Sequence, residues 1–202
     1  MRALSALLTV PAFFFALGIA GSAQAQDTGK IAVVAAQNFY GDIARQIGGD
    51  RVSVVSVLMN PDQDPHLFEP SPAVARQIAD AQIVIANGAH YDEWVDKLLK
   101  TAPRPGRTVI SAAKLVKAKH GDNPHLWYTP ATMPAVAKAI AGALSKADSA
   151  HAAAYSERLA KTLANLDRIA QRVTEMRAKH AGKPVAATEP VFGLMADALG
   201  LT

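Results

Sequence analysis

Residues 31–58 have the sequence IAVVAAQNFYGDIARQIGGDRVSVVSVL, and this stretch decides the fold. Residues 31–36 form a continuous apolar run, which is typical of a strand buried on both faces of a sheet. Residues 39–47 fit a helix that a pair of glycines closes. Residues 52–58 form a second strand. A strand, a helix and a strand in this order predict two parallel strands with a helix lying across the sheet.

The same alternation continues for about fifty residues. A helix is expected to run to residue 79, with Ser71 as its N-cap and Pro72 at its first position. Further apolar runs predict strands at 82–86 and 108–111, and a helical pattern at 91–100 lies between them. The sequence therefore predicts the α/β class, with a parallel sheet covered by helices.

The pattern becomes helical after this region. One helix is expected at 133–144, and a longer amphipathic helix at 150–179. The apolar positions of the longer helix are spaced by threes and fours and are Tyr155, Leu159, Leu163, Leu166, Ile169, Val173 and Met176. Thirty helical residues reach roughly 45 Å, which exceeds one small lobe. We interpret this helix as a rigid link between two lobes, and a coiled-coil dimer seam is the alternative.

A second lobe is expected to begin after this long helix. Residues 184–188 predict a strand and residues 192–199 a helix. A lone strand and helix do not make a stable domain, so we expect the second lobe to be truncated. The expected organisation is a signal peptide (1–25), an N-terminal α/β lobe (26–148), a linking helix (149–180) and the start of the C-terminal α/β lobe (181–202).

The first 25 residues have the features of a secretory signal peptide. Arg2 supplies the positive start, residues 7–20 are apolar, and Ala23-Gln24-Ala25 is a small-x-small cleavage site. We expect cleavage after Ala25, which would place the mature chain in the periplasm. An uncleaved membrane anchor is the alternative, although the apolar run is short for a membrane span.

Charge and cysteine usage exclude several classes of function. The chain has 21 basic and 17 acidic residues, a net charge of +4. Without residues 1–25 there are 20 basic and 17 acidic residues, or +3, and no basic block. This pattern argues against binding to nucleic acid. There is no cysteine, so disulfides and thiolate metal sites are both excluded.

Two histidines stand in similar local sequences that favour a metal site. His66 lies in DPHLFEP (64–70) and His125 in NPHLWY (123–128). In each case a proline stiffens the loop before the histidine, and the apolar residues that follow can anchor the loop to the core. A rigidly held imidazole is what a preformed metal site requires.

The positions of these histidines along the predicted fold support the same interpretation. His66 follows the second predicted strand, His125 follows the fourth, and Glu189 follows the strand expected at 184–188. Ligands of open α/β sheets bind beyond the carboxyl ends of the strands. Two imidazoles and a carboxylate suit a first-row divalent ion. The alternatives are loop histidines bonded to backbone, and a Glu189 carboxylate that caps the helix after it.

Two further histidines lie near these motifs. His90 follows a strand end and is a further candidate for the cleft. His120 is either a metal-recruiting residue or a solvated loop histidine.

Three segments, DPH-x-x-EP at 64–70, NPHLW at 123–127 and EPVFG at 189–193, occur together in this order. With them the chain resembles, over residues 31–202, the substrate-binding protein of zinc/manganese ABC importers. The resemblance implies two α/β lobes joined by one long helix, with His66 and His125 as ligands from the first lobe and Glu189 as the third. The acidic fourth ligand of the family has no counterpart among the 202 residues.

The resemblance also implies a function. The protein would be a monomeric, periplasmic carrier that captures Zn²⁺ or Mn²⁺ and delivers the ion to the membrane permease of an ABC importer with its cytoplasmic ATPase. Iron is a third possible cargo. A carrier of this kind is not an enzyme.

Two other functions use the same ligands. A secreted metallohydrolase would need a general base beside them, but HExxH and G-x-S-x-G are both absent from the sequence. A metal-binding adhesin is the other alternative, and no feature of the sequence supports adhesion apart from metal binding.

Overall fold

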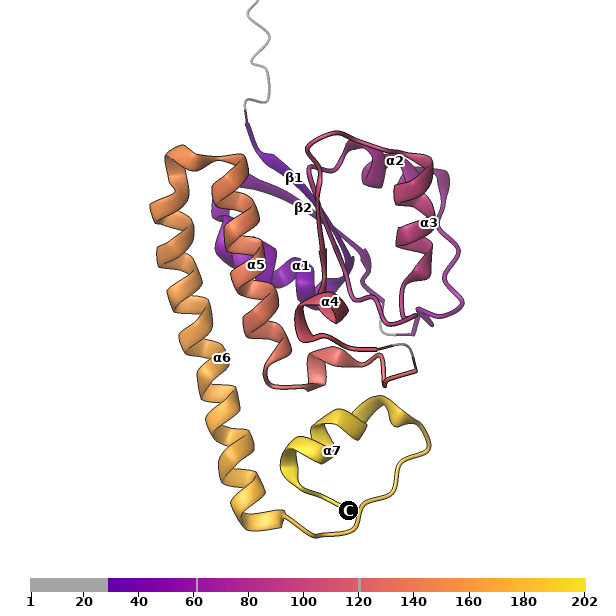
Figure 1. Cartoon of the computed structure of the whole chain (residues 1–202), viewed down its shortest axis with the longest axis vertical. Helices are drawn as coiled ribbons and strands as arrows, with labels where there is room; N and C mark the ends of the chain where they lie inside the picture. The colour runs from indigo at the N-terminus through magenta and orange to yellow at the C-terminus, as the bar shows by residue number, and fades with distance from the viewer. Residues whose placement is uncertain (1–28, 61, 120) are drawn as a thin grey trace, which may run out of the picture.

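A computed structural model describes residues 29–60, 62–119 and 121–202 of the chain (Figure 1). The predicted signal peptide and its cleavage site lie outside the described residues, as does His120. Within the described ranges, no helix combines the length and the apolar character needed to cross a membrane.

Four parallel strands form one sheet, as the sequence predicts. They are β1 (Ile31–Gln37), β2 (Val52–Leu58), β3 (Ile83–Ala86) and β4 (Thr108–Ser111), in the order β2-β1-β3-β4. Gln37 lies opposite Leu58, and Ala86 lies opposite Ser111, so the strands end at the same edge of the sheet. The chain moves from β1 outward to β2 and then returns to place β3 on the other side of β1.

The helices match the predicted ones closely, with one addition. They are α1 (Asn38–Gly48), α2 (Pro72–Asp80), α3 (Glu93–Thr101), α4 (Ala112–Val116), α5 (Thr132–Ala147), α6 (Ala152–His180) and α7 (Gly193–Leu199). Short 3₁₀ turns are η1 (Gly49–Arg51), η2 (Leu126–Tyr128), η3 (Ser149–His151) and η4 (Pro190–Phe192). Ser71 caps α2 as expected, since its hydroxyl accepts a hydrogen bond from the Val74 N–H at 3.3 Å. The five-residue α4 was not predicted, because it is too short to show a helical period.

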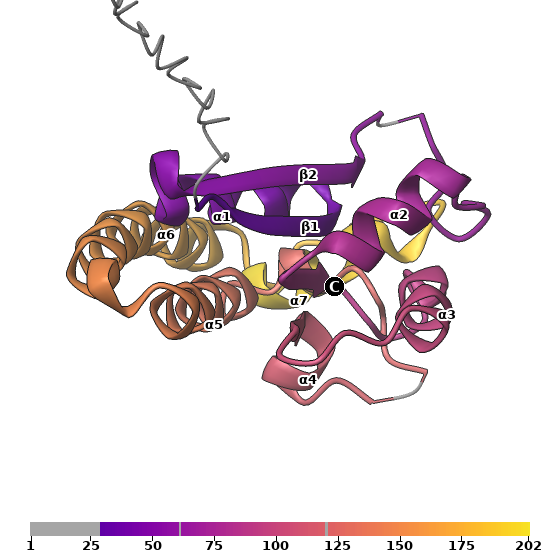
Figure 2. The same ribbon diagram turned by 90° about the horizontal axis from the view of Figure 1, so that it is seen from above.

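Alternate side chains of the strands belong to two separate apolar layers. Figure 2 shows α5 and α6 together at one side of the strands and α2 and α3 together at the other. Val33 and Ile85 belong to the layer beneath α1, α5 and α6. Val34 and Val84 belong to the layer beneath α2 and α3. Burial on both faces explains why the sequences of the central strands β1 and β3 are continuous apolar runs rather than alternating ones.

The long helix α6 contains 29 residues and spans roughly 43 Å. Its first half packs against α1 and α5, and Tyr155 is fully buried there. Arg158 donates hydrogen bonds to the carbonyls of Ile47 and Gly48, which ties α6 to the end of α1. The far half leaves the sheet and carries α7 beside its end (Figure 1). The first half of the predicted apolar stripe therefore packs against other helices of the same chain.

The strand predicted at 184–188 is wrong. These residues are extended and exposed, and they form no ladder with the sheet. Two backbone hydrogen bonds join the start of this segment to Thr202. The Val185 N–H donates to the Thr202 carbonyl, and the Thr202 N–H donates to the Lys183 carbonyl. A strand requires a neighbouring strand over several residues, and a local apolar pattern cannot supply one. Glu189 consequently follows an extended segment and directly precedes η4.

Candidate metal centre

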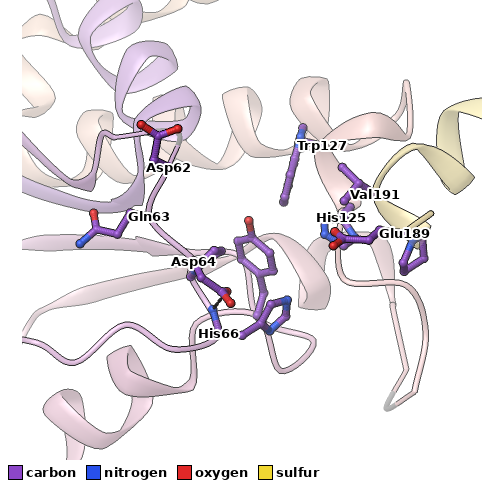
Figure 3. Close-up of a pocket in the computed structure, with 11 residues that line it drawn as sticks. Asp62, Gln63, Asp64, His66, His125, Trp127, Glu189 and Val191 are labelled. Carbon is purple, nitrogen blue, oxygen red and sulfur yellow. Dashed lines mark hydrogen bonds between the residues drawn. The ribbon is translucent and has the colours of Figure 1, made fainter. Parts of the chain in front are cut away.

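A cavity of about 570 Å³ opens beyond the carboxyl edge of the sheet, and all three predicted ligands line it (Figure 3). Its lining residues are Asp62, Gln63, Asp64, Pro65, His66, Tyr91, His125, Trp127, Glu189, Pro190 and Val191. The segments that supply them lie far apart in sequence, and the fold brings them together.

The sheet order explains why the cavity forms at this place. β1 lies between β2 and β3, and the connections after β1 and β3 leave in opposite directions. This switch in direction opens a crevice at the carboxyl edge of an open parallel sheet. The loop after β2 carries His66 and the loop after α4 carries His125, so two edge strands deliver loops to one crevice.

His125 is held by burial and by hydrogen bonds. Its side chain and that of the next residue, Leu126, are both buried. The Asn123 Oδ1 accepts a hydrogen bond from the His125 backbone N–H at 3.0 Å and lies 2.7 Å from the His125 Nδ1. Because Oδ1 can only accept, Nδ1 must carry the proton in this contact. The Nε2 of His125 therefore keeps the lone pair that a metal needs.

His66 is held through its backbone rather than by burial. Its N–H donates to the Asp64 Oδ1 at 2.8 Å, and its side chain is exposed. The expectation that Leu67 anchors the loop is wrong, since Leu67 is 78% exposed. Phe68 makes the anchoring contact with Trp94, at 5.0 Å between ring centres. Phe68, rather than Leu67, therefore anchors this loop to the core.

Glu189 lies beside His125, and His66 lies apart from both (Figure 3). The Glu189 side chain is exposed. It precedes η4 but accepts no capping hydrogen bond from that turn. The alternative role of this carboxylate as a helix cap therefore has no support in the described residues.

The two imidazoles are near the limit for sharing one ion. The ring centres of His66 and His125 lie 6.5 Å apart, with 74° between the planes. With metal–nitrogen bonds of about 2.0–2.1 Å, two rings on one ion have centres roughly 5–6.5 Å apart. Among the described residues, no three histidine or acidic side chains are close enough to hold an ion together. The side chains of His66 and Glu189 are both exposed.

The charge state of His125 suits coordination. Burial lowers the pKa of His125, and the nearby His66 lowers it further, while the Glu189 carboxylate acts in the opposite direction. The neutral imidazole is the form that binds metal. Because the pKa is lowered, this form persists at pH values below the usual pKa of histidine.

Tyr91 and Trp127 form an aromatic wall of the cavity, and sequence reasoning missed Tyr91. The Tyr91 ring lies 5.1 Å from that of His66 and 5.6 Å from that of His125. Trp127 lies 5.4 Å from His125 and 5.1 Å from Tyr91. Burial, together with the Asp92 carboxylate, raises the pKa of Tyr91 to about 12, so its hydroxyl stays protonated. The large residues after His125 were noted in the sequence, but Tyr91 reaches the site only through the fold.

A sharp backbone turn places Tyr91 in the cavity and His90 outside its lining. Ala89 and His90 both have positive φ angles, of 51° and 63°. The Tyr91 N–H donates to the Gly88 carbonyl at 3.1 Å, which closes the turn. The His90 ring contacts the Glu93 carboxylate instead. His90, a further candidate from the sequence, is thus paired with the start of α3.

A buried polar network around Asp92 holds the loop that carries His125. Asp92 is 3% exposed and accepts hydrogen bonds from the Gln37 side chain at 2.9 Å and from the N–H groups of Asn87 and Gly88 at 2.7 and 2.8 Å. The Asn87 amide in turn donates to the Pro124 carbonyl at 2.8 Å. The network connects the ends of β1 and β3 to the residue before His125.

Solved structures share this fold. The metal-dependent lipoprotein YcdH from Bacillus subtilis superimposes with a TM-score of 0.75 at 23% identity, over 83% of this chain and 64% of that one. The periplasmic zinc-binding protein TroA from Treponema pallidum gives a TM-score of 0.72 at 20% identity, over 86% of this chain and 65% of that one. The molecule therefore has the α/β fold of these metal-binding proteins.

Sequence comparison defines the family. Residues 33–202 match the family described as zinc-uptake complex component A, periplasmic, and the chain belongs to this family. The chain is 29% identical over 161 residues to the iron-binding protein YfeA of Yersinia pestis. This match covers 75% of this chain and 51% of YfeA. The chain spans about half the length of the relatives that it matches in sequence.

Proposed function

We propose that the chain captures a first-row divalent metal ion outside the cytoplasmic membrane and holds it with His66, His125 and Glu189. The observation that carries this proposal is the shared cavity, in which these three side chains come from three separate loops. The neutral form of His125 and its fixed Nδ1 support the same role. Family membership supports it independently.

We infer that the ion is cargo and is passed to the membrane permease of an ABC importer, which a cytoplasmic ATPase drives. Names of similar proteins support this inference: relatives include a manganese-binding lipoprotein of Bacillus subtilis and a manganese ABC transporter substrate-binding lipoprotein of Streptococcus mitis. A periplasmic location after signal cleavage, and a monomeric state, complete the proposal.

The donor set admits more than one metal. Imidazole and carboxylate ligands accept zinc, manganese and iron, and intrinsic affinity favours zinc over manganese at such a site. We propose zinc or manganese as the cargo. Competition between the two ions at equal concentration would rank them directly.

Titration calorimetry on the mature chain tests the site. His66→Ala, His125→Ala and Glu189→Ala should each weaken binding of Zn²⁺ or Mn²⁺ by at least tenfold. The control is His180→Ala, at the far end of α6, which should bind like the wild type. Equal affinity of His125→Ala and the control would refute the proposed ligands.

A carrier should show no turnover. The metal-loaded chain is expected to leave peptides, esters and phosphate esters unchanged in long incubations. A metal-dependent hydrolytic rate that disappears in His66→Ala would overturn the carrier role in favour of an enzyme.

A further inference from the structure

Asn123 contacts two of the residues that line the cavity, His125 and Pro190. Its Oδ1 accepts from the His125 backbone and lies against the His125 ring nitrogen. Its Nδ2 donates to the Pro190 carbonyl at 2.6 Å, across 67 residues of sequence. One side chain thus joins a predicted ligand of the first lobe to the residue next to Glu189.

The orientation of the Asn123 amide is fixed by chemistry. The His125 backbone N–H can only donate, so it must face Oδ1. Pro190 has a carbonyl but no N–H, so it must face Nδ2. Both ends of the amide are matched, and reversing it would oppose two donors at one end and two acceptors at the other.

The chain is shaped to admit this contact. A Cβ added at Gly193 would lie 3.2 Å from the Asn123 Nδ2, which is tighter than most such contacts. Nearby, the rings of Tyr128 and Phe192 lie 6.0 Å apart and bring the same two segments together. The amide therefore lies at a close approach between the His125 loop and the turn η4.

We propose that Asn123 is a positioning residue that couples the His125 ring to the loop carrying Glu189. The proposal rests on the proposed metal-binding function for its purpose, but the coupling itself is a property of the chain. A single amide then sets the tautomer of one ligand and the position of another. Loss of the bond to Pro190 would free the Glu189 loop without disturbing His125.

Aspartate at this position would separate the two roles. Asn123→Asp keeps an oxygen for the His125 N–H and Nδ1, but it places a carboxylate oxygen against the Pro190 carbonyl. Two acceptors repel at that distance, so the bond to the Pro190 carbonyl is lost. Asn123→Ala removes both contacts. The pair of variants distinguishes coupling from simple orientation of the ring.

Hydrogen exchange in the absence of metal tests the coupling. Peptides covering residues 190–199 should exchange about threefold to tenfold faster in Asn123→Asp than in the wild type, as expected for one lost hydrogen bond. Asn165→Asp, an exposed change of the same chemistry on α6, is the control and should exchange like the wild type. Wild-type exchange in Asn123→Asp, with an unchanged unfolding midpoint, would overturn the proposal.

Metal binding gives the second measurement. Asn123→Ala should weaken Zn²⁺ binding about tenfold to a hundredfold, because the ring loses its partner. Asn123→Asp should keep the ring oriented but release Zn²⁺ faster than the wild type in a chelator chase. Equal release rates in the two proteins would contradict the coupling. If the wild type binds no metal, the proposed function fails, whereas the exchange result still decides the role of Asn123.

Discussion

Asp92→Ala should destabilise the protein and loosen the metal site together. The Asp92 carboxylate is buried and accepts three hydrogen bonds, one from the Gln37 side chain and two from backbone N–H groups. Removing it leaves three donors without a partner, and each unsatisfied buried donor costs about 1–3 kcal/mol.

The net loss should be smaller than the sum of these costs. Burial raises the pKa of Asp92, because a buried site disfavours the ionised carboxylate. Removing that charge recovers part of the lost free energy of unfolding. A water molecule can also enter the space left behind and accept hydrogen bonds from the donors. We expect a decrease of about 2–5 kcal/mol in the free energy of unfolding at neutral pH.

Urea unfolding followed by circular dichroism measures this change. The control is Asp96→Ala, an exposed acidic residue one turn further along α3, which should stay within about 0.5 kcal/mol of the wild type. Zn²⁺ binding should also weaken in Asp92→Ala, because Asp92 holds the backbone N–H of Asn87, the residue whose side-chain amide donates to the Pro124 carbonyl. A loss of less than about 1 kcal/mol would refute the reasoning.

Three further predictions concern pH, packing and processing. The pKa of His125 is lower in the folded chain than its unfolded value of about 6.5. The contribution of His125 to the free energy of unfolding should therefore be complete above about pH 6.5 and decline as the pH falls below that value. His125→Gln should flatten this decline in urea unfolding between about pH 6.5 and 5. Gly41→Ala should cost about 1–3 kcal/mol of thermal stability, because the added Cβ meets the Ser56 hydroxyl, whereas Gly142→Ala, in open space on α5, should be neutral or stabilising. Mass spectrometry of exported protein should find a mature chain that begins at Gln26, and a chain that retains residues 7–20 would refute cleavage.

Features set by neighbouring residues could be predicted from the sequence. The strand bounds 52–58 and 108–111 agree with β2 and β4. The central strands β1 and β3 were found because burial on both faces leaves a continuous apolar run. The Ser71 cap and the long helix α6 follow from local chemistry and from a repeat of three and four residues. His66 and His125 were found because a proline and apolar residues surround each of them.

Features that depend on distant partners were decided by the tertiary structure alone. Residues 184–188 have an apolar pattern, yet no strand lies beside them in the described part of the chain, so they remain extended. Tyr91 reaches the cavity because the order of the strands brings its loop there, and Asn123 finds the Pro190 carbonyl only through folding. A sequence pattern records which groups need a partner, whereas the packing of the whole chain determines which partner each group meets.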